Sequence, residues 1–131
     1  MSLFGAIGIA GTGVTVYRKW LDAVSDNIAN INDAAPTSGP AFQARYVVAT
    51  PSDGGGVEVG GTALGSAAGR LVHEPDNPLA DEHGMVRYPD IDLSSQMGQM
   101  IMAQRGYQAN LAVVDRAHDA YQAALQLGRN A

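Results

Sequence analysis

Most of the side chains of this sequence that could hold a metal ion are gathered in one loop, and the third histidine, His118, lies apart from them. Two histidines and four acidic residues share it: His73, Glu74, Asp76, Asp81, Glu82 and His83. Zinc sites need several ligands that converge on one point, usually with a recognisable spacing. The spacing here matches no such motif, and a solvated acidic loop accounts for the same residues. The sequence therefore predicts no metal and no cofactor.

Other arrangements that could do chemistry are equally weak. Asp90 and Asp92 could act as paired carboxylates, but nothing near them indicates a desolvated pocket, and Asp92 is well placed to cap a helix. The glycines at residues 54–56 follow no strand–turn–helix pattern, so they indicate a turn rather than a phosphate-binding loop. The chain has no cysteine, which excludes thiolate chemistry and disulfides. We expect a protein that is not an enzyme.

Asparagines are concentrated where the first helix is expected to end. Asn27, Asn30 and Asn32 fall within six residues of one another. They either signal the end of the helix, which suits Asn32, or let Asn27 and Asn30 make polar contacts between helices, and both interpretations remain open. Near the other end of the chain, four further residues are candidates for polar contacts at helix interfaces: Arg105, Tyr107, Gln108 and Asn110.

The elements that must position these residues are long helices. Two ladders alternate steps of three and four along the sequence. The first contains Ile7, Ala10, Val14, Tyr17, Leu21, Val24, Ile28 and Ile31. The second contains Met97, Met100, Gln104, Tyr107, Leu111, Val114, His118, Tyr121 and Leu125. Such spacing places each set on one narrow stripe of a helix, as in a coiled coil. Both stripes need a partner helix, so they indicate assembly rather than catalysis.

Composition and charge support one small domain with solvated acidic residues in its middle. The chain has 131 residues, a net charge of −5 and only 6% aromatic residues. Residues 33–92 hold nine acids and three arginines, a net charge of −6, whereas residues 1–32 sum to zero and residues 93–131 to +1. No basic stripe is available to neutralise phosphates, so nucleic-acid binding is not expected.

The predicted fold is mainly α with a small β insert. We expect a helix over residues 3–32, strands over 42–50, 57–59, 68–73 and 85–88, and a last helix over 93–127, with Asp92 as N-cap and Gly128 just past its end. The chain divides into an N-terminal helix (1–32), a β and loop insert (33–92) and a C-terminal helix (93–131). The two helices should pack as an antiparallel, coiled-coil-like pair.

The apolar N-terminal stretch is not expected to enter a membrane. Residues 3–16 precede the basic pair Arg18 and Lys19, whereas a signal peptide has its positive charge first, and the stretch is too short to span a bilayer. Its glycines either let neighbouring backbones approach closely or mark a frayed tail: Gly5, Gly8, Gly11 and Gly13. The continuing apolar stripe favours the first. We expect this segment to become ordered when partner subunits cover it.

Three motifs carry a family resemblance. The run Asn27-Ile28-Ala29-Asn30 is similar to the N-terminal signature of bacterial flagellar rod and hook proteins, and QRGYQANLAV at residues 104–113 resembles their C-terminal signature. Residues 73–91 (HEPDNPLADEHGMVRYPDI) resemble the corresponding run of a proximal rod protein. Met85 and Asp90 depart from the usual Tyr and Asn of that run, which affects loop contacts.

The resemblance implies a structural subunit of the flagellar basal body. Such proteins are exported unfolded by the flagellar type III apparatus, without a cleaved signal peptide. They polymerise with copies of themselves and with other rod proteins into a hollow, periplasm-spanning shaft that transmits torque. The alternative is a secreted helical-hairpin adaptor that binds one partner and never polymerises. The residues expected to carry assembly are Ile7, Val14, Tyr17, Leu21, Val24, Asn27, Ile28, Asn30, Ile31, Met97, Met100, Gln104, Arg105, Tyr107, Gln108, Asn110, Leu111, Val114, Tyr121 and Leu125.

Overall fold

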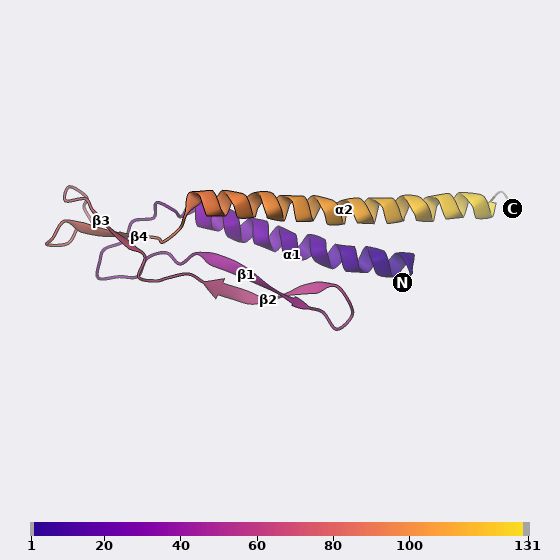
Figure 1. Ribbon diagram of the computed structural model, residues 1–131, viewed down its shortest axis with the longest axis horizontal. Coiled ribbons are helices and arrows are strands. Elements are labelled where there is room, and N and C mark those ends of the chain that lie inside the picture. The colour runs from indigo at the N-terminus through magenta and orange to yellow at the C-terminus, as the bar shows by residue number, and fades with distance from the viewer. Residues whose placement is uncertain (1, 130–131) are drawn as a thin grey trace.

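Two long helices run side by side in opposite directions and form the body of the molecule. A computed structural model describes residues 2–129, so Met1 and residues 130–131, the outer ends of the predicted terminal units, lie outside the described residues. Helix α1 spans Leu3–Ala29 and helix α2 spans Leu93–Arg129. The C-terminal end of α2 continues past the start of α1 (Figure 1). The predicted class, an antiparallel helical pair with a small β insert, is confirmed.

Side-chain caps set the start of each helix. The Ser2 hydroxyl accepts a hydrogen bond from the Gly5 N–H at 3.0 Å. The Asp92 carboxylate accepts one from the Ser95 N–H at 2.7 Å, as predicted for an N-cap. Because only the first four N–H groups of a helix lack an internal partner, each cap satisfies a group that would otherwise remain free.

The ends of the helices differ from the prediction. Helix α1 ends at Ala29 rather than near Asn32. The Asn30 N–H still donates to the Asp26 carbonyl four residues back, but the next N–H, that of Ile31, donates to the Ile28 carbonyl only three residues back, and the Asn30 side-chain amide also donates to the Asp26 carbonyl. Helix α2 runs to Arg129, so Gly128 is a helical residue and not the residue after the helix. A single glycine costs a helix only about 1 kcal/mol, which a helix of 37 residues tolerates.

The insert contains two separate two-stranded sheets. In the first, β1 (Arg45–Pro51) pairs antiparallel with β2 (Val57–Leu64), with a bulge between Val48 and Ala49. In the second, β3 (Arg70–His73) pairs with β4 (Met85–Tyr88). Strand β4 has its predicted bounds. Strand β1 begins at residue 45 instead of 42, and β3 begins at residue 70 instead of 68. Strand β2 begins at residue 57 as predicted but continues to residue 64 instead of ending at 59. Because glycine is disfavoured in strands, Gly60 and Gly61 led to a predicted end of β2 that is too early. At Gly60 a Cβ would lie 2.5 Å from the Thr50 side chain, so the pairing requires glycine there.

The β1–β2 hairpin lies along α1, on the side away from α2, so α1 is the middle layer (Figure 1). The Val57 N–H donates to the Thr12 hydroxyl at 3.1 Å and fixes one end of the hairpin to the helix. The side chains buried along α1 are small: Ala10, Gly13, Val16, Ala23, Val24 and Asn27. Close approach of the layers is possible because few of these residues are bulky.

The β3–β4 sheet lies beyond the helical pair and is held by Arg87. The Arg87 backbone exchanges two hydrogen bonds with Ala35, at 2.8 and 2.9 Å. Its guanidinium donates to the carbonyl oxygens of Ala68 and Thr37. These contacts connect β4 to the segment between α1 and β1 and to the segment between β2 and β3. None of the helices described within residues 2–129 is long and apolar enough to cross a bilayer.

Candidate assembly interface

The contact between α1 and α2 is the most extensive packing in the molecule and combines small and polar residues. On α2 the buried side chains are Gln96, Ala103 and Ala117, and half-buried Asn110 falls on the same side, since all four are spaced by seven. A seven-residue repeat keeps one side of a helix facing its partner. The face that α2 turns to α1 is therefore short-chained and partly polar.

Asn27 connects three segments at one end of this contact. It is fully buried, and its amide nitrogen donates to the Gln96 Oε1 of α2 and to the Arg45 carbonyl oxygen, both at 3.0 Å. Its amide oxygen accepts from the Arg45 N–H at 2.7 Å. The asparagine cluster had two interpretations. Asn27 makes the inter-helix contact, whereas the Asn30 side chain bonds only to the Asp26 carbonyl at the end of α1.

Two glycines, one on each helix, receive side chains from the other helix. A Cβ at Gly13 would lie 2.5 Å from the Asn110 Oδ1, and one at Gly106 would lie 2.3 Å from the Tyr17 ring. No neighbouring atom lies within 4 Å of a Cβ built at Gly8 or Gly11. Room for the Asn110 side chain thus explains Gly13, whereas Gly8 and Gly11 have no such neighbour.

Aromatic side chains fill the rest of the contact. Tyr17 and Trp20 stack with their ring centroids 6.0 Å apart, and the Trp20 indole N–H donates to the Gln99 Oε1 at 3.3 Å. Near the N-terminus of α1, Phe4 packs edge-on against Tyr121 at 5.6 Å. Such aromatic pairs contribute about 0.5–1.5 kcal/mol beyond the area they bury.

The predicted assembly residues divide into two groups by exposure. Those of α1 and of the two residues after it are all buried or half-buried: Ile7, Val14, Tyr17, Leu21, Val24, Asn27, Ile28, Asn30 and Ile31. On α2 the half-buried members are Met100, Tyr107, Asn110 and Val114. The remaining members on α2 are exposed: Met97, Gln104, Arg105, Gln108, Leu111, Tyr121 and Leu125. Gln96, Ala103 and Ala117 are not among the predicted residues, although their spacing in multiples of seven was an available indication.

Helix α2 presents large apolar side chains to solvent along its whole length. Each of the following is at least 40% exposed: Leu93, Met97, Ile101, Met102, Leu111, Val113, Tyr121, Leu125 and Leu127. Several large apolar side chains exposed along one helix are typical of a surface that another chain covers. Helix α1 differs, because α2 and the hairpin cover two of its sides, and only Phe4 and Ile9 among its large apolar residues are comparably exposed.

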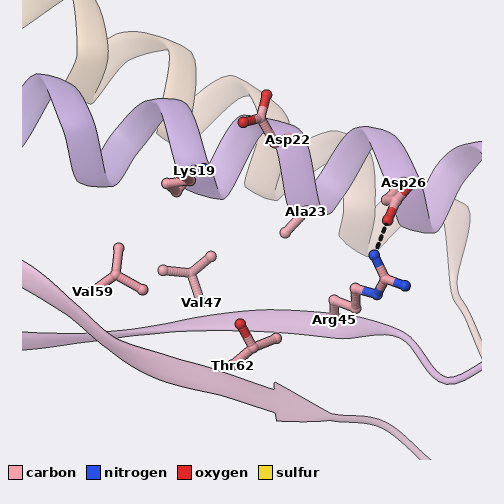
Figure 2. A pocket seen from close by; sticks show the side chains of 8 residues that line it. All are labelled: Lys19, Asp22, Ala23, Asp26, Arg45, Val47, Val59 and Thr62. Atoms are coloured by element: carbon pink, nitrogen blue, oxygen red, sulfur yellow. Dashed lines mark hydrogen bonds and ion pairs between the residues drawn. The ribbon is translucent and has the colours of Figure 1, made fainter.

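A groove separates α1 from the β1–β2 hairpin. Figure 2 shows Lys19, Ala23 and Asp26 facing Val47 and Val59 of the hairpin across it. The cavity in this part has a volume of about 310 Å³, and an adjoining one toward the hairpin tip has about 370 Å³. An ion pair between Arg45 and Asp26 closes the first cavity at one side.

The acidic loop before β4 is organised by its own side chains. The Asp81 carboxylate accepts hydrogen bonds from the His83 and Met85 N–H groups, at 2.9 and 3.0 Å, and from the Thr37 hydroxyl at 2.8 Å. The Met85 N–H, with the Thr37 hydroxyl next, lowers the pKa of Asp81 below its ordinary 3.8. No group of three potential metal ligands converges within residues 2–129. Asp81 therefore shapes the loop.

Comparisons with known proteins place the chain among flagellar rod proteins. The family described as "Flagellar basal body rod FlgEFG protein C-terminal" matches residues 82–127, which include the QRGYQANLAV motif. The flagellar basal-body rod protein FlgC of Salmonella typhimurium is 34% identical over 134 residues, covering 98% of this chain and 100% of the relative. FlgC of Agrobacterium fabrum is 39% identical over 123 residues, covering 89% of this chain and 88% of the relative. FlgC of Borreliella burgdorferi is 27% identical over 149 residues, with 97% and 98% covered. The chain belongs to the FlgC family of flagellar basal-body rod proteins.

Proposed function

We propose that this chain polymerises, through its terminal helices, with copies of itself and other rod proteins into the hollow shaft that transmits torque. In this proposal it is a structural, non-catalytic subunit of a rod that spans the periplasm. It is exported by the flagellar type III apparatus without a cleaved signal peptide. Membership of a family of flagellar rod components supports this assignment.

The exposed apolar residues of α2 are the observation that carries the proposal. The face that α2 turns to α1 is satisfied by small and polar residues, whereas Met97, Ile101 and Leu111 remain in solvent. Burial of apolar surface contributes about 25 cal/mol per Å². A subunit that buries these side chains against several neighbours gains from each contact, which suits a shaft under torque.

Replacing one of these side chains by a charge tests the proposal. In cells that lack their own copy of the gene, the Leu111→Asp variant should not restore motility or rods, because a carboxylate cannot enter a dry interface without a partner. Export into the medium should continue, since Leu111 is 40% exposed and the change does not disturb the subunit core. Swimming in soft agar and electron microscopy of purified basal bodies provide the measurements.

Leu71→Asp is the matched control. Leu71 lies in β3, is 52% exposed and is outside both helices, so this variant should swim normally. Leu21→Asp should also block rod formation, but Leu21 is half-buried, so its effect includes loss of subunit stability. Full motility of the Leu111→Asp variant would contradict the proposal. A discrete complex with one other protein, found by sedimentation in place of rods, would favour the adaptor.

A further inference from the structure

The last two turns of α2 have no partner within the described part of the chain. Every residue from 122 to 129 is exposed, and the segment projects about 12 Å past Tyr121, which packs on Phe4 near the start of α1 (Figure 1). Leu125 follows Ala117 and Tyr121 at steps of four, so it continues the side that faces α1. Leu125 and Leu127 are 51% and 74% exposed. We name residues 122–129 the overhang.

The groove between α1 and the hairpin has an apolar lining that could bury apolar side chains such as those of the overhang. Its two cavities share Lys19 and Val59 in their linings, so they adjoin each other along the groove. Ala23 of α1 and Val47 of the hairpin face each other across the first cavity (Figure 2), and Val16 of α1 lines the second, so both have apolar lining. Each cavity has the volume of a small-molecule site, yet no converging set of polar groups marks a ligand among the described residues. Apolar side chains of a helix fit this lining.

Charges at the edge of the groove favour the overhang as the occupant. Asp26 is already paired with Arg45, which leaves Lys19, Asp22 and Glu58, a net charge of −1, among the lining residues. The overhang has one charged residue, Arg129. Within one molecule the two surfaces cannot meet, because the overhang points away from the hairpin and beyond its tip (Figure 1).

We propose that the overhang of one copy docks in the α1–hairpin groove of a second copy, with Leu125 against the apolar lining and Arg129, one turn later on the same side, beside Asp22 and Glu58. This inference rests on the proposed function and adds the contact that joins neighbouring copies. The two surfaces differ, so the contact is head-to-tail and leaves a free groove and a free overhang at the two ends of any chain of copies. Contacts of this kind build rings or open helical assemblies rather than closed dimers.

The absence of cysteine from the sequence makes disulfide cross-linking a direct test. Leu125→Cys and Val59→Cys are introduced together into cells that lack the native gene, and the cells are treated with copper phenanthroline. Non-reducing electrophoresis of purified basal bodies should show a ladder of dimers, trimers and longer species. The control pair, Leu125→Cys with Leu64→Cys on an exposed position of β2 outside the groove, should give no ladder.

The outcomes separate this contact from the proposed function. Swimming cells whose groove pair gives no ladder, or a product that stops at the dimer, would overturn the head-to-tail contact while rod function stands. If the double-cysteine variant fails to assemble, the docking contact is tested instead by exchanging the charges of Arg129 and Glu58. Arg129→Glu and Glu58→Arg should each reduce the swimming diameter at least twofold, and the combined variant should recover most of it. Lack of recovery would overturn the docking of the overhang.

Discussion

Asn27 is a polar side chain that the fold buries completely, at the point where α1, α2 and the start of β1 meet. Its amide makes three hydrogen bonds, one to Gln96 and two to the Arg45 backbone. A buried polar group costs little when it is fully bonded, but each partner left unpaired costs about 1–3 kcal/mol. These three hydrogen bonds therefore favour one alignment of the three segments over alternatives that lack them.

Asn27→Ala is expected to reduce the free energy of unfolding by about 2–4 kcal/mol, since it strands the Gln96 amide and the Arg45 backbone groups. Urea unfolding followed by circular dichroism measures the change. Asn30→Ala is the matched control. That amide bonds the Asp26 carbonyl at a helix end and is only half-buried, so a loss of about 1 kcal/mol or less is expected. Equal losses in the free energy of unfolding would mean that the buried hydrogen bonds of Asn27 stabilise the fold no more than an ordinary bond at a helix end.

At the scale of elements, the helical pair depends on glycines that admit side chains from the opposite helix. Gly106 accommodates the Tyr17 ring, which is itself stacked on Trp20 and so has little room to move. Gly98 lies on the same helix with no atom within 4 Å of an added Cβ. The two glycines share one local conformation and differ only in what faces them.

Gly106→Ala should destabilise the subunit by about 1–3 kcal/mol despite the better helix propensity of alanine, because the new methyl group overlaps the Tyr17 ring. Gly98→Ala should instead stabilise it, by up to about 1 kcal/mol. Thermal unfolding of the two variants beside the parent protein measures both effects. A rise in melting temperature for both would show that the helices do not approach closely at Gly106.

The sequence predicts the helices well and their contact face less well. Periodicity and the Asp92 cap locate both helices to within a few residues. On α2, however, a ladder drawn through large apolar residues alternates between the inward side, at Met100 and Tyr107, and the solvent side, at Met97 and Leu111. The inward positions that it misses are Ala103 and Ala117, together with the polar Gln96. Close packing selects small side chains, so a rule based on hydrophobicity does not recognise them. The Asn27–Gln96 bond joins residues 69 positions apart and has no local indication.

At the scale of the molecule, burial is unevenly distributed along the helical pair. The region around Asn27, Ala103 and Gly106 is covered on both helices, whereas the overhang has solvent on all sides. Local opening costs little free energy where few apolar contacts hold a segment. In the isolated subunit, local opening should thus be rare near Asn27 and frequent toward the C-terminal end of α2.

Hydrogen exchange measured by mass spectrometry tests this gradient. In the isolated subunit the amides of residues 122–129 should exchange at least about tenfold faster than those of residues 100–110, because opening the overhang breaks almost no tertiary contact. In purified basal bodies the difference should largely disappear, since neighbours would then cover the same turns. Uniformly slow exchange in the isolated protein would mean that one copy satisfies its own apolar surface. Subunits of that kind would have little to gain from burying α2 against one another.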